Sequence, residues 1–547
     1  MPPNTRLPAI ALLGVALALS PAALPAQSSE ITAREIDGYL RYLSSDLLEG
    51  RAPATRGGRV AAAYIESQLA AFGLEPAAKG SYIQKVPIDV VAAERQSLRA
   101  SASGKATATL RYPEDVVVWA GSAAERSAAR AELVFVGYGA VAPEYRWNDF
   151  KDVDVKGKIL VVLVNDPPAP GAEPTLFGGR AMTYYGRWPY KFEEAERQGA
   201  RGALVVHTTE RAGYPWHTVV GSWAKEQRML PRDPGLPPPL GFRGWITDSA
   251  AGALFRQAGL DLARLRTAAE SRDFRPVPTG ITLDIAFSNT VQHLESENVL
   301  GLVRGSDPKL RGEHLMLSTH WDHLGIGPTV NGDSIYNGAS DNASGTADML
   351  AIARAAAKGP RPRRSLLFAF VTAEESGLLG SQYLAENPVV ATEEIVANLN
   401  VDGGNLYGRV RDLNVLGDTK SSLGPELAAF LKPRGMRITP EEFPERGSFY
   451  RSDHFSFAKA GVPSVSIGEG NDFVGKPGGW GTTVHQDYTD HRYHQPGDQY
   501  RADFDLTGAV QLSGIVLDFA RTLANSAAWP TWNRDAEFKR PPRKKVM

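Results

Sequence analysis

From residue 295 onward, short apolar runs alternate with amphipathic segments, and this alternation constrains the fold more than any other feature of the chain. The strand candidates are HLMLSTH, RRSLLFAFVTA, IVANLNVD and GVPSVSIG, and the helix candidates are SGTADMLAIARAAAK and GLLGSQYLAEN. Such alternation is typical of α/β domains, in which helices cover parallel strands. We therefore predict an α/β fold with a mixed, mostly parallel central sheet flanked by helices.

The chain has 547 residues, which is more than one hydrophobic core usually supports. Residues 31–76 have the pattern of two amphipathic helices separated by a turn that contains Gly and Arg. Residues 95–290 change character, with short apolar strands such as GKILVVLV, many prolines and the helix-to-strand unit KFEEAERQGARGALVV. This middle block contains no dense cluster of His and acidic residues.

The two ends of the chain differ from its body. Arg6 is followed by the apolar run LPAIALLGVALALS and then by PAALPAQ, which is typical of a secretory signal peptide covering residues 1–26. An uncleaved anchor is the alternative. No later segment predicts a transmembrane helix, so we expect a secreted or periplasmic protein. The tail, residues 527–547, ends in the basic stretch FKRPPRKKVM, which is typical of disorder.

Composition excludes several kinds of chemistry. The net charge is only −1, which gives no overall field for binding nucleic acid or anionic membranes. The chain has no cysteine, so it has no disulfide, no thiolate metal ligand and no cysteine nucleophile. No GxSxG motif indicates a serine hydrolase. Any metal must be held by His, Asp or Glu.

Polar residues follow the predicted strands at the edge of the sheet where ligands bind in α/β folds. The residues after the strands are His320, Asp322 and His323, then Glu374 and Glu375, then Asp402. Asp341 lies in NGASDNASGTA, and HQDYTDHRYHQPGD supplies His485, His491 and His494. Singly, Asp341 could be a helix cap, Asp402 a turn residue and each His a surface residue. Together they indicate one shared pocket.

Oxygen and imidazole ligands suit zinc, cobalt or manganese. Two metals need a bridging carboxylate with an acid and a histidine on each side, and two His, two Asp and one Glu meet that count. One of the adjacent glutamates is then left over. It would serve as the base that takes a proton from water and delivers it to a leaving amine.

Several motifs, taken together and in order, resemble the co-catalytic di-zinc exopeptidase family of aminopeptidase Y and glutamate carboxypeptidase. They are LSTHWDHLGIG, GDSIYNGASDNASGTADML, FVTAEESGLLGSQYL, NLNVDGG, SFYRSDHFSFAKAGVPSV and RYHQPGD. The middle block resembles a protease-associated domain. The resemblance implies a zinc exopeptidase fold in two parts, residues 30–95 and 291–526, with a β-rich protease-associated domain inserted at 96–290.

The resemblance also implies residue roles and two Zn²⁺ ions. The implied ligands are His320 and Asp402 for one metal, Glu375 and His494 for the other, and Asp341 as the bridge. Glu374 would be the general base, Asp322 would orient the imidazole of His320, and Tyr493 would donate to the oxyanion. His494 is chosen among the clustered histidines because it alone lies in a YHxPxD context.

We therefore predict an aminopeptidase that acts on peptides with a free N-terminus. A carboxypeptidase or dipeptidase of the same fold is the first alternative, and its cationic pocket would draw on Arg446, Arg451 or Arg492. A glutaminyl cyclase, which uses one zinc, is the second. A non-enzymatic binding module is disfavoured because every implied ligand position holds a competent residue. No nucleic-acid partner is expected.

Overall fold

The structure is a computed structural model, and it describes residues 31–169 and 171–542. The predicted signal peptide, residues 1–26, and the end of the basic tail, residues 543–547, lie outside the described residues. Among the residues it does describe, no helix is long and apolar enough to cross a membrane.

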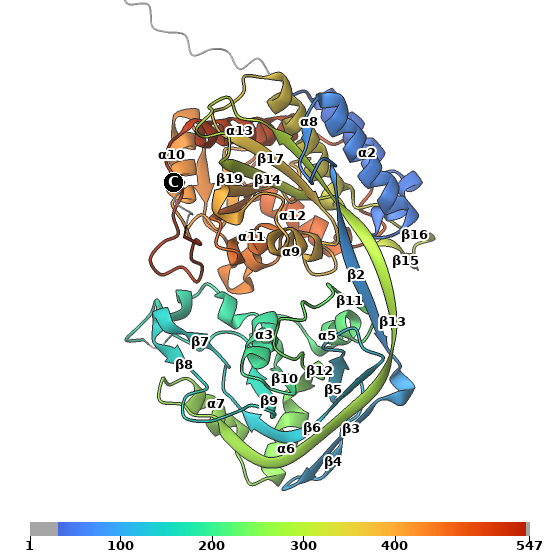
Figure 1. Cartoon of the computed structure of the whole chain (residues 1–547), viewed down its shortest axis with the longest axis vertical. Coiled ribbons are helices and arrows are strands. Elements are labelled where there is room, and N and C mark those ends of the chain that lie inside the picture. The colour runs from blue at the N-terminus through green and yellow to red at the C-terminus, as the bar shows by residue number, and fades with distance from the viewer. Residues whose placement is uncertain (1–30, 170, 543–547) are drawn as a thin grey trace, which may run out of the picture. The chain divides into compact units, whose positions relative to one another are not determined.

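The first sheet has a parallel centre in the order β17, β14, β18 and β21, of which Figure 1 labels β17 and β14. These strands span Ser365–Val371, His314–His320, Ile395–Asn400 and Ser464–Glu469. Antiparallel neighbours flank this centre, with β13 beside β17 and β19 beside β21. The outer strands are β1 (Glu75–Pro76), β2 (Ile83–Ala93), β11 (Gln227–Met229), β13 (Val277–Val303), β19 (Asp412–Leu416) and β20 (Arg437–Thr439). The predicted mixed, mostly parallel sheet is confirmed.

Helices cover both faces of this sheet, which explains why β14, β17 and β18 are buried along their whole length. In β17, Leu366, Phe368 and Phe370 face one buried cluster, and the alternate residues face another. The first cluster includes α1 (Ala33–Leu43), α2 (Arg56–Phe72), α8 (Gly345–Lys358), α10 (Leu423–Leu431) and α13 (Thr507–Asn525). The second includes α9 (Leu379–Glu386) and α11 (His454–Lys459). The helices expected between residues 31 and 76 are present as α1 and α2, and Thr32 and Thr55 cap them.

The region from 96 to 290 builds a second mixed sheet with helices on both faces. Its parallel strands follow the order β6, β9, β10 and β12. The strands are β3 (Arg99–Gly104), β4 (Ala108–Thr109), β5 (Val116–Trp119), β6 (Arg126–Phe135), β9 (Ile159–Leu163), β10 (Gly202–His207) and β12 (Phe242–Thr247). The helices are α3 (Trp188–Arg197) and α5 (Trp216–Trp223) on one face, and α6 (Asp248–Gln257) and α7 (Leu262–Ala269) on the other.

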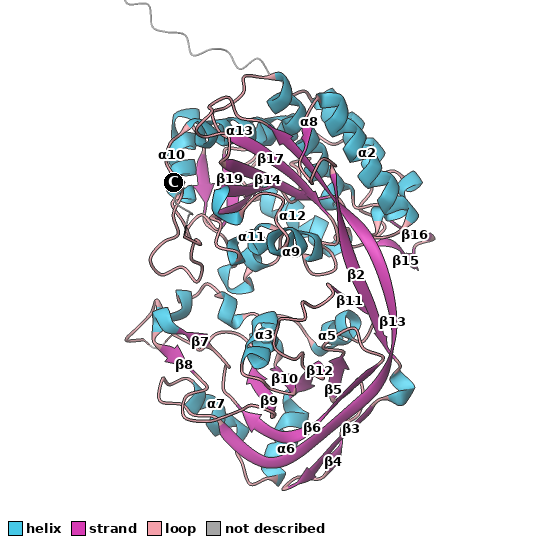
Figure 2. Ribbon diagram, in the orientation of Figure 1, coloured by secondary structure: helices cyan, strands magenta, loops and turns pink. Residues whose placement is uncertain are grey.

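One strand, β13, belongs to both sheets, and Figure 2 shows it as a long arrow with β2 alongside. Residues 277–288 pair with β6, residues 289–299 with β2 and residues 299–303 with β17. The expected end of the insertion at residue 290 therefore falls inside a continuous strand. The remaining strands and α-helices are β7 (Val141–Ala142), β8 (Trp147–Asn148), β15 (Gly325–Val330), β16 (Asp333–Tyr336), α4 (Thr209–Ala212) and α12 (Trp480–His491).

The described part of the basic tail is held against the rest of the chain. Phe538 is buried in an aromatic cluster with Phe449 and Phe455. Arg540 donates to the backbone carbonyls of Ile395 and Val396 at 2.7 and 2.6 Å. The expected disorder is thus wrong for residues 538–540, because the ring and the guanidinium of this short stretch both find partners.

Candidate metal centre

The predicted ligands converge at the carboxyl edge of the parallel centre. His320 is the last residue of β14, Glu375 follows β17 and Asp402 follows β18. Because these strands are parallel and adjacent, their carboxyl ends lie together. Asp341 comes from the loop before α8, and His494 from the turn after α12.

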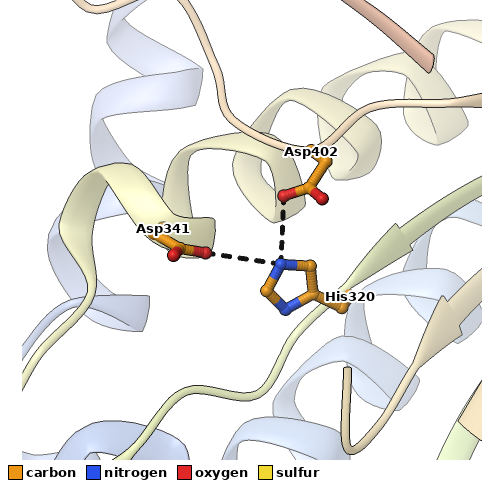
Figure 3. Close-up of side chains that lie close together, drawn as sticks. All are labelled: His320, Asp341 and Asp402. Carbon is orange, nitrogen blue, oxygen red and sulfur yellow. Dashed lines mark hydrogen bonds and ion pairs between the residues drawn. The ribbon is translucent and has the colours of Figure 1, made fainter. Parts of the chain in front are cut away.

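Asp341 and Asp402 approach the same nitrogen of His320 (Figure 3). Nε2 of His320 lies 3.1 Å from Oδ1 of Asp402 and 3.4 Å from Oδ1 of Asp341. Nδ1 of His320 lies 3.2 Å from the backbone carbonyl of Asp322. When Nδ1 donates to that carbonyl, the lone pair of Nε2 is turned toward the two carboxylates, as a metal ligand requires.

Asp341 also reaches a second group through its other oxygen. Nε2 of His494 lies 3.2 Å from Oδ2 of Asp341 and 3.1 Å from Oε2 of Glu375. His494 has a left-handed backbone, with φ of 57°, which turns its ring back toward the loops of the sheet edge. Asp341 is therefore shared by two groups of potential ligands, one on each of its oxygens.

The orientation of His494 fits a cation better than hydrogen bonds. Its Nε2 is buried within 3.2 Å of two carboxylates, yet it forms no aligned hydrogen bond with any described residue. Ligand lone pairs that converge on a common point have this geometry, because they do not point at each other. Imidazole nitrogen with carboxylate oxygen is also the donor set that zinc accepts. The residues present thus fit a divalent cation.

The electrostatics of the cluster lead to the same conclusion. Although burial lowers it, the pKa of His494 is raised to about 10 by Asp341 and Glu375. Burial raises the pKa of Asp341, but hydrogen bonding to His320 and His494 outweighs burial and holds this pKa well below its usual range. The carboxylates therefore require nearby positive charge, and protons on the histidines supply it when no cation is bound. A divalent cation would replace those protons.

Glu374 occupies the position next to the cluster without belonging to either group. Its backbone N–H donates to Oδ1 of Asp322 at 3.1 Å, which fixes the start of the glutamate turn. Its side chain is partly exposed, and burial, opposed by His320 and assisted by Asp402, raises its pKa well above the usual value. A carboxylate with a raised pKa beside a cluster of potential metal ligands is suited to accept and return a proton.

The structure places the other two predicted residues at the cluster, with one difference in detail. The ring of Tyr493 stacks on His494 with centroids 3.9 Å apart, and the side chain is 46% exposed. The carboxylate of Asp322 lies 3.7 Å from Nδ1 of His320, farther than its own backbone carbonyl. The main chain of Asp322 is therefore the nearer partner of the imidazole.

Comparison with known families places the site in a known context. Residues 298–520 match the model of peptidase family M28. Residues 298–520, the M28 region, are thus similar to this family. The matched range contains every predicted site residue, and the expected kinship with zinc exopeptidases is confirmed at the level of the family.

Individual relatives match over different lengths of the chain. Leupeptin-inactivating enzyme 1 of Streptomyces exfoliatus is 30% identical over 227 residues, covering 40% of this chain and 47% of that protein. A probable glutamate carboxypeptidase of Arabidopsis thaliana is 25% identical over 387 residues, covering 63% and 49%. The chain thus spans about half the length of these curated relatives. Among solved structures, an aminopeptidase from Aneurinibacillus sp. strain AM-1 matches with 19% identity and a TM-score of 0.47, covering 94% of this chain and 98% of that one.

Three residues that the sequence analysis did not assign hold the loops of the M28 site. Asp498 accepts from the backbone N–H of Ser340 and of Asp341, at 3.0 and 3.1 Å. The side-chain oxygen of Asn342 accepts from the N–H of Gly403, next to Asp402, at 2.8 Å. Both residues lie in motifs noted in the sequence, since Asp498 ends RYHQPGD and Asn342 follows Asp341. Their hydrogen-bond partners are backbone N–H groups, which a sequence motif does not identify.

Arg51 is the third such residue, and it is fully buried. Its guanidinium donates to the carbonyl of Trp321 at 2.9 Å and to that of Gly338 at 3.1 Å. It thereby ties the loop that follows His320 to the loop that leads to Asp341. Burial lowers its pKa to about 10, so it remains charged at neutral pH. Nothing in the sequence around it, other than the basic residue itself, indicates this role.

Some histidines of the M28 region lie in the cluster and others lie outside it. Nε2 of His485 lies 3.2 Å from Glu469, and His491 is paired with Asp487 on the surface, so neither joins the cluster. His323, which the sequence analysis placed at the strand end without a role, does join it. Ligand atoms of His323, Asp341 and Glu375 all lie within 4.8 Å of one another.

Proposed function

We propose that the chain is a secreted zinc aminopeptidase that removes N-terminal residues from peptides. The observation that carries this proposal is the convergence of His320, Asp402, Glu375 and His494 on the two oxygens of Asp341, with Glu374 beside them. This set would hold two zinc ions, with cobalt or manganese as substitutes. When bound, such ions polarise a carbonyl and lower the pKa of a water molecule.

In the proposed reaction, the carboxylate of Glu374 takes a proton from the attacking water. The water oxygen forms a bond with the scissile carbonyl carbon, and the hydroxyl of Tyr493 donates to the carbonyl oxygen as negative charge develops there. Glu374 then returns its proton to the amine as the carbon–nitrogen bond breaks. Asp322 and the loop contacts of Asp498 keep the reacting groups in place.

A carboxypeptidase or dipeptidase is the second candidate, and one observation favours it. The guanidinium of Arg451 has no ion pair among the described residues, so it is free to bind a substrate carboxylate. The other two candidates are engaged, because Arg492 pairs with Asp487 at 2.8 Å and Arg446 lies over the ring of Phe443. A carboxylate pocket would therefore depend on a single arginine, which ranks this activity below the aminopeptidase.

Mass spectrometry of a mixed pool of free and N-acetylated peptides tests the proposal. We expect ladders shortened from free N-termini, which a chelator abolishes and added zinc restores. Shortening from the C-terminus, including that of acetylated peptides, would replace the aminopeptidase by the carboxypeptidase. Two zinc ions per chain favour the hydrolase, whereas one would favour a glutaminyl cyclase.

The remaining regions have proposed roles without chemistry of their own. We propose that residues 96–290 are a protease-associated domain that affects substrate access to the site. In support, Arg228 of β11, within this region, lies 3.4 Å from Ser376, which follows the two glutamates. We also propose that residues 1–26 direct export and are removed, which N-terminal sequencing of the exported protein would test.

A further inference from the structure

The two oxygens of Glu375 have different partners, and this division assigns a role to His323. Oε2 is the oxygen that lies 3.1 Å from Nε2 of His494. Oε1 lies 2.7 Å from Nδ1 of His323, in aligned hydrogen-bond geometry. Both side chains are inaccessible or nearly so, with 0% of His323 and 7% of Glu375 exposed. Oε2 thus faces His494, while Oε1, on the other side of the carboxylate, accepts a hydrogen bond from His323.

The imidazole of His323 is fixed in its position by close packing. A methyl group on Gly338 would lie 2.5 Å from Cγ of His323, so the glycine allows the ring to sit against the backbone of the Asp341 loop. The ring also meets His494 edge-on, with centroids 5.7 Å apart. His323 is therefore enclosed between the loop that carries the shared ligand and the histidine of the second group.

His323 and His494 contact the same carboxylate in different ways. Nδ1 of His323 is aligned with Oε1 of Glu375, as a donor is with its acceptor. Nε2 of His494 is near Oε2 but is not aligned with it, as expected of two ligands that share a cation. A buried carboxylate that ligates through one oxygen needs a donor on the other, because an unsatisfied buried oxygen is costly and leaves the group free to rotate.

We infer that His323 is a positioning residue for the second metal: it donates from Nδ1 to Oε1 of Glu375 and so directs Oε2 toward the cation, without being a ligand itself. This inference rests on the proposed two-metal function. It predicts that the second metal depends on the Nδ1–H group of His323, while the metal held by His320 and Asp402 does not.

The test compares two amide substitutions that place a donor at different points of the imidazole. The amide nitrogen of His323→Asn lies near the position of Nδ1, whereas that of His323→Gln lies near the position of Nε2. Zinc stoichiometry and affinity are measured for both by competition with a chromophoric chelator, with circular dichroism and a thermal melt to verify folding. We expect His323→Asn to bind two zinc ions nearly as tightly as the wild type, and His323→Gln to lose about 10–100-fold in affinity at one site only.

His314 provides a matched control, because it is a buried histidine at the opposite end of β14. His314→Gln should keep both affinities. Equal weakening in His323→Asn and His323→Gln would overturn the inference, since it would indicate direct ligation by the imidazole. Wild-type affinity in His323→Gln would overturn it too.

The readout separates this inference from the proposed function. A wild-type protein that binds two zinc ions but cleaves no peptide would overturn the proposed function, while the comparison of the two amides would still decide the role of His323. A wild-type protein that binds only one zinc ion would overturn both.

Discussion

The chain contains two parallel strand edges with acidic residues, and they use these residues in opposite ways. At the edge of β14, β17 and β18, carboxylates and imidazoles face one another around Asp341. At the edge of β9, Asp166 accepts from the N–H of Thr183 at 2.8 Å and from its hydroxyl at 2.6 Å. The nearby Lys191 donates to the carbonyls of Tyr138 and Asn165.

The difference shows that a carboxylate at a strand end does not by itself make a site. Asp166 has internal donors and a buried cation close by, so its lone pairs are already satisfied. At the other edge, the oxygens of Asp341 and Oε2 of Glu375 lie near imidazole nitrogens, and Nε2 of His494 is not aligned with either carboxylate, so lone pairs remain available to a metal. The pattern of satisfied and unsatisfied groups, rather than the number of acids, separates the edge at β9 from the edge proposed to bind metal.

The largest expected effect is the loss of both metals when Asp341 is removed. Among the described residues, Asp341 alone forms ion pairs with both His320 and His494, so for Asp341→Ala we expect zinc at neither site and peptidase activity at background. Asp402→Ala should lose only the metal held with His320. Metal analysis by mass spectrometry of dialysed proteins measures both. If Asp341→Ala keeps one tightly bound zinc, the shared role of this carboxylate is wrong.

A large effect on rate without loss of metal is expected for Glu374. Glu374→Gln keeps the shape of the side chain but removes the proton acceptor, so kcat should fall by about 10²–10⁴-fold while zinc content stays near that of the wild type. Steady-state kinetics measures kcat, and metal analysis of the same sample measures its zinc content. A metal-free variant would instead make Glu374 a ligand.

At the second edge we expect effects on stability alone. Lys191→Met leaves two buried carbonyls without their donor and Asp166 without its neighbouring cation, which should reduce the free energy of unfolding by about 3 kcal/mol. Zinc content should not change. Urea unfolding followed by tryptophan fluorescence measures the first quantity. A loss of zinc in this variant would mean that the two edges are coupled.

A pH dependence of stability is also expected at the same edge. Burial raises the pKa of Asp166 to about 7, above its unfolded value near 3.8, so its ionisation favours the unfolded chain. Its contribution to stability is fully present below pH 3.8 and is lost as the pH rises toward 7. Relative to Asp166→Asn, the wild type should therefore lose stability between pH 4 and pH 7 in paired urea titrations. A constant difference across this range would contradict the raised pKa.

The sequence predicted which residues gather at the sheet edge better than it predicted how distant segments are connected. Alternating strands and helices locate His320, Glu374, Glu375 and Asp402, because the ends of neighbouring parallel strands must meet. His494 followed from its motif. The roles of Arg51 and His323 could not be predicted from the sequence. Arg51 donates to backbone carbonyls of distant loops, and the position of His323 depends on the packing of its ring against Gly338.

The sequence also did not show where the second sheet ends and the first begins, because β13 runs through both. Buried and exposed residues alternate in β13 from Ile281 to Phe287, and the strand then continues through residue 303 with no turn signal. The tail shows the converse, because FKRPPRKKVM is polar in composition, yet its single aromatic ring is buried. Composition describes the average of a segment, whereas one well-placed side chain decides whether it docks.

Because β13 is continuous, its length fixes the register of its side chains in both hydrophobic cores. Residues 289–299 pair with β2 between the part that serves the second sheet and the part that serves the first. Side chains alternate with a period of two, so inserting or deleting one residue here would turn every residue beyond it to the opposite face. The core on one side or the other would then present its apolar residues to water. Loops can tolerate changes of length. In residues 289–299, by contrast, we expect the fold to accept substitutions but not insertions or deletions.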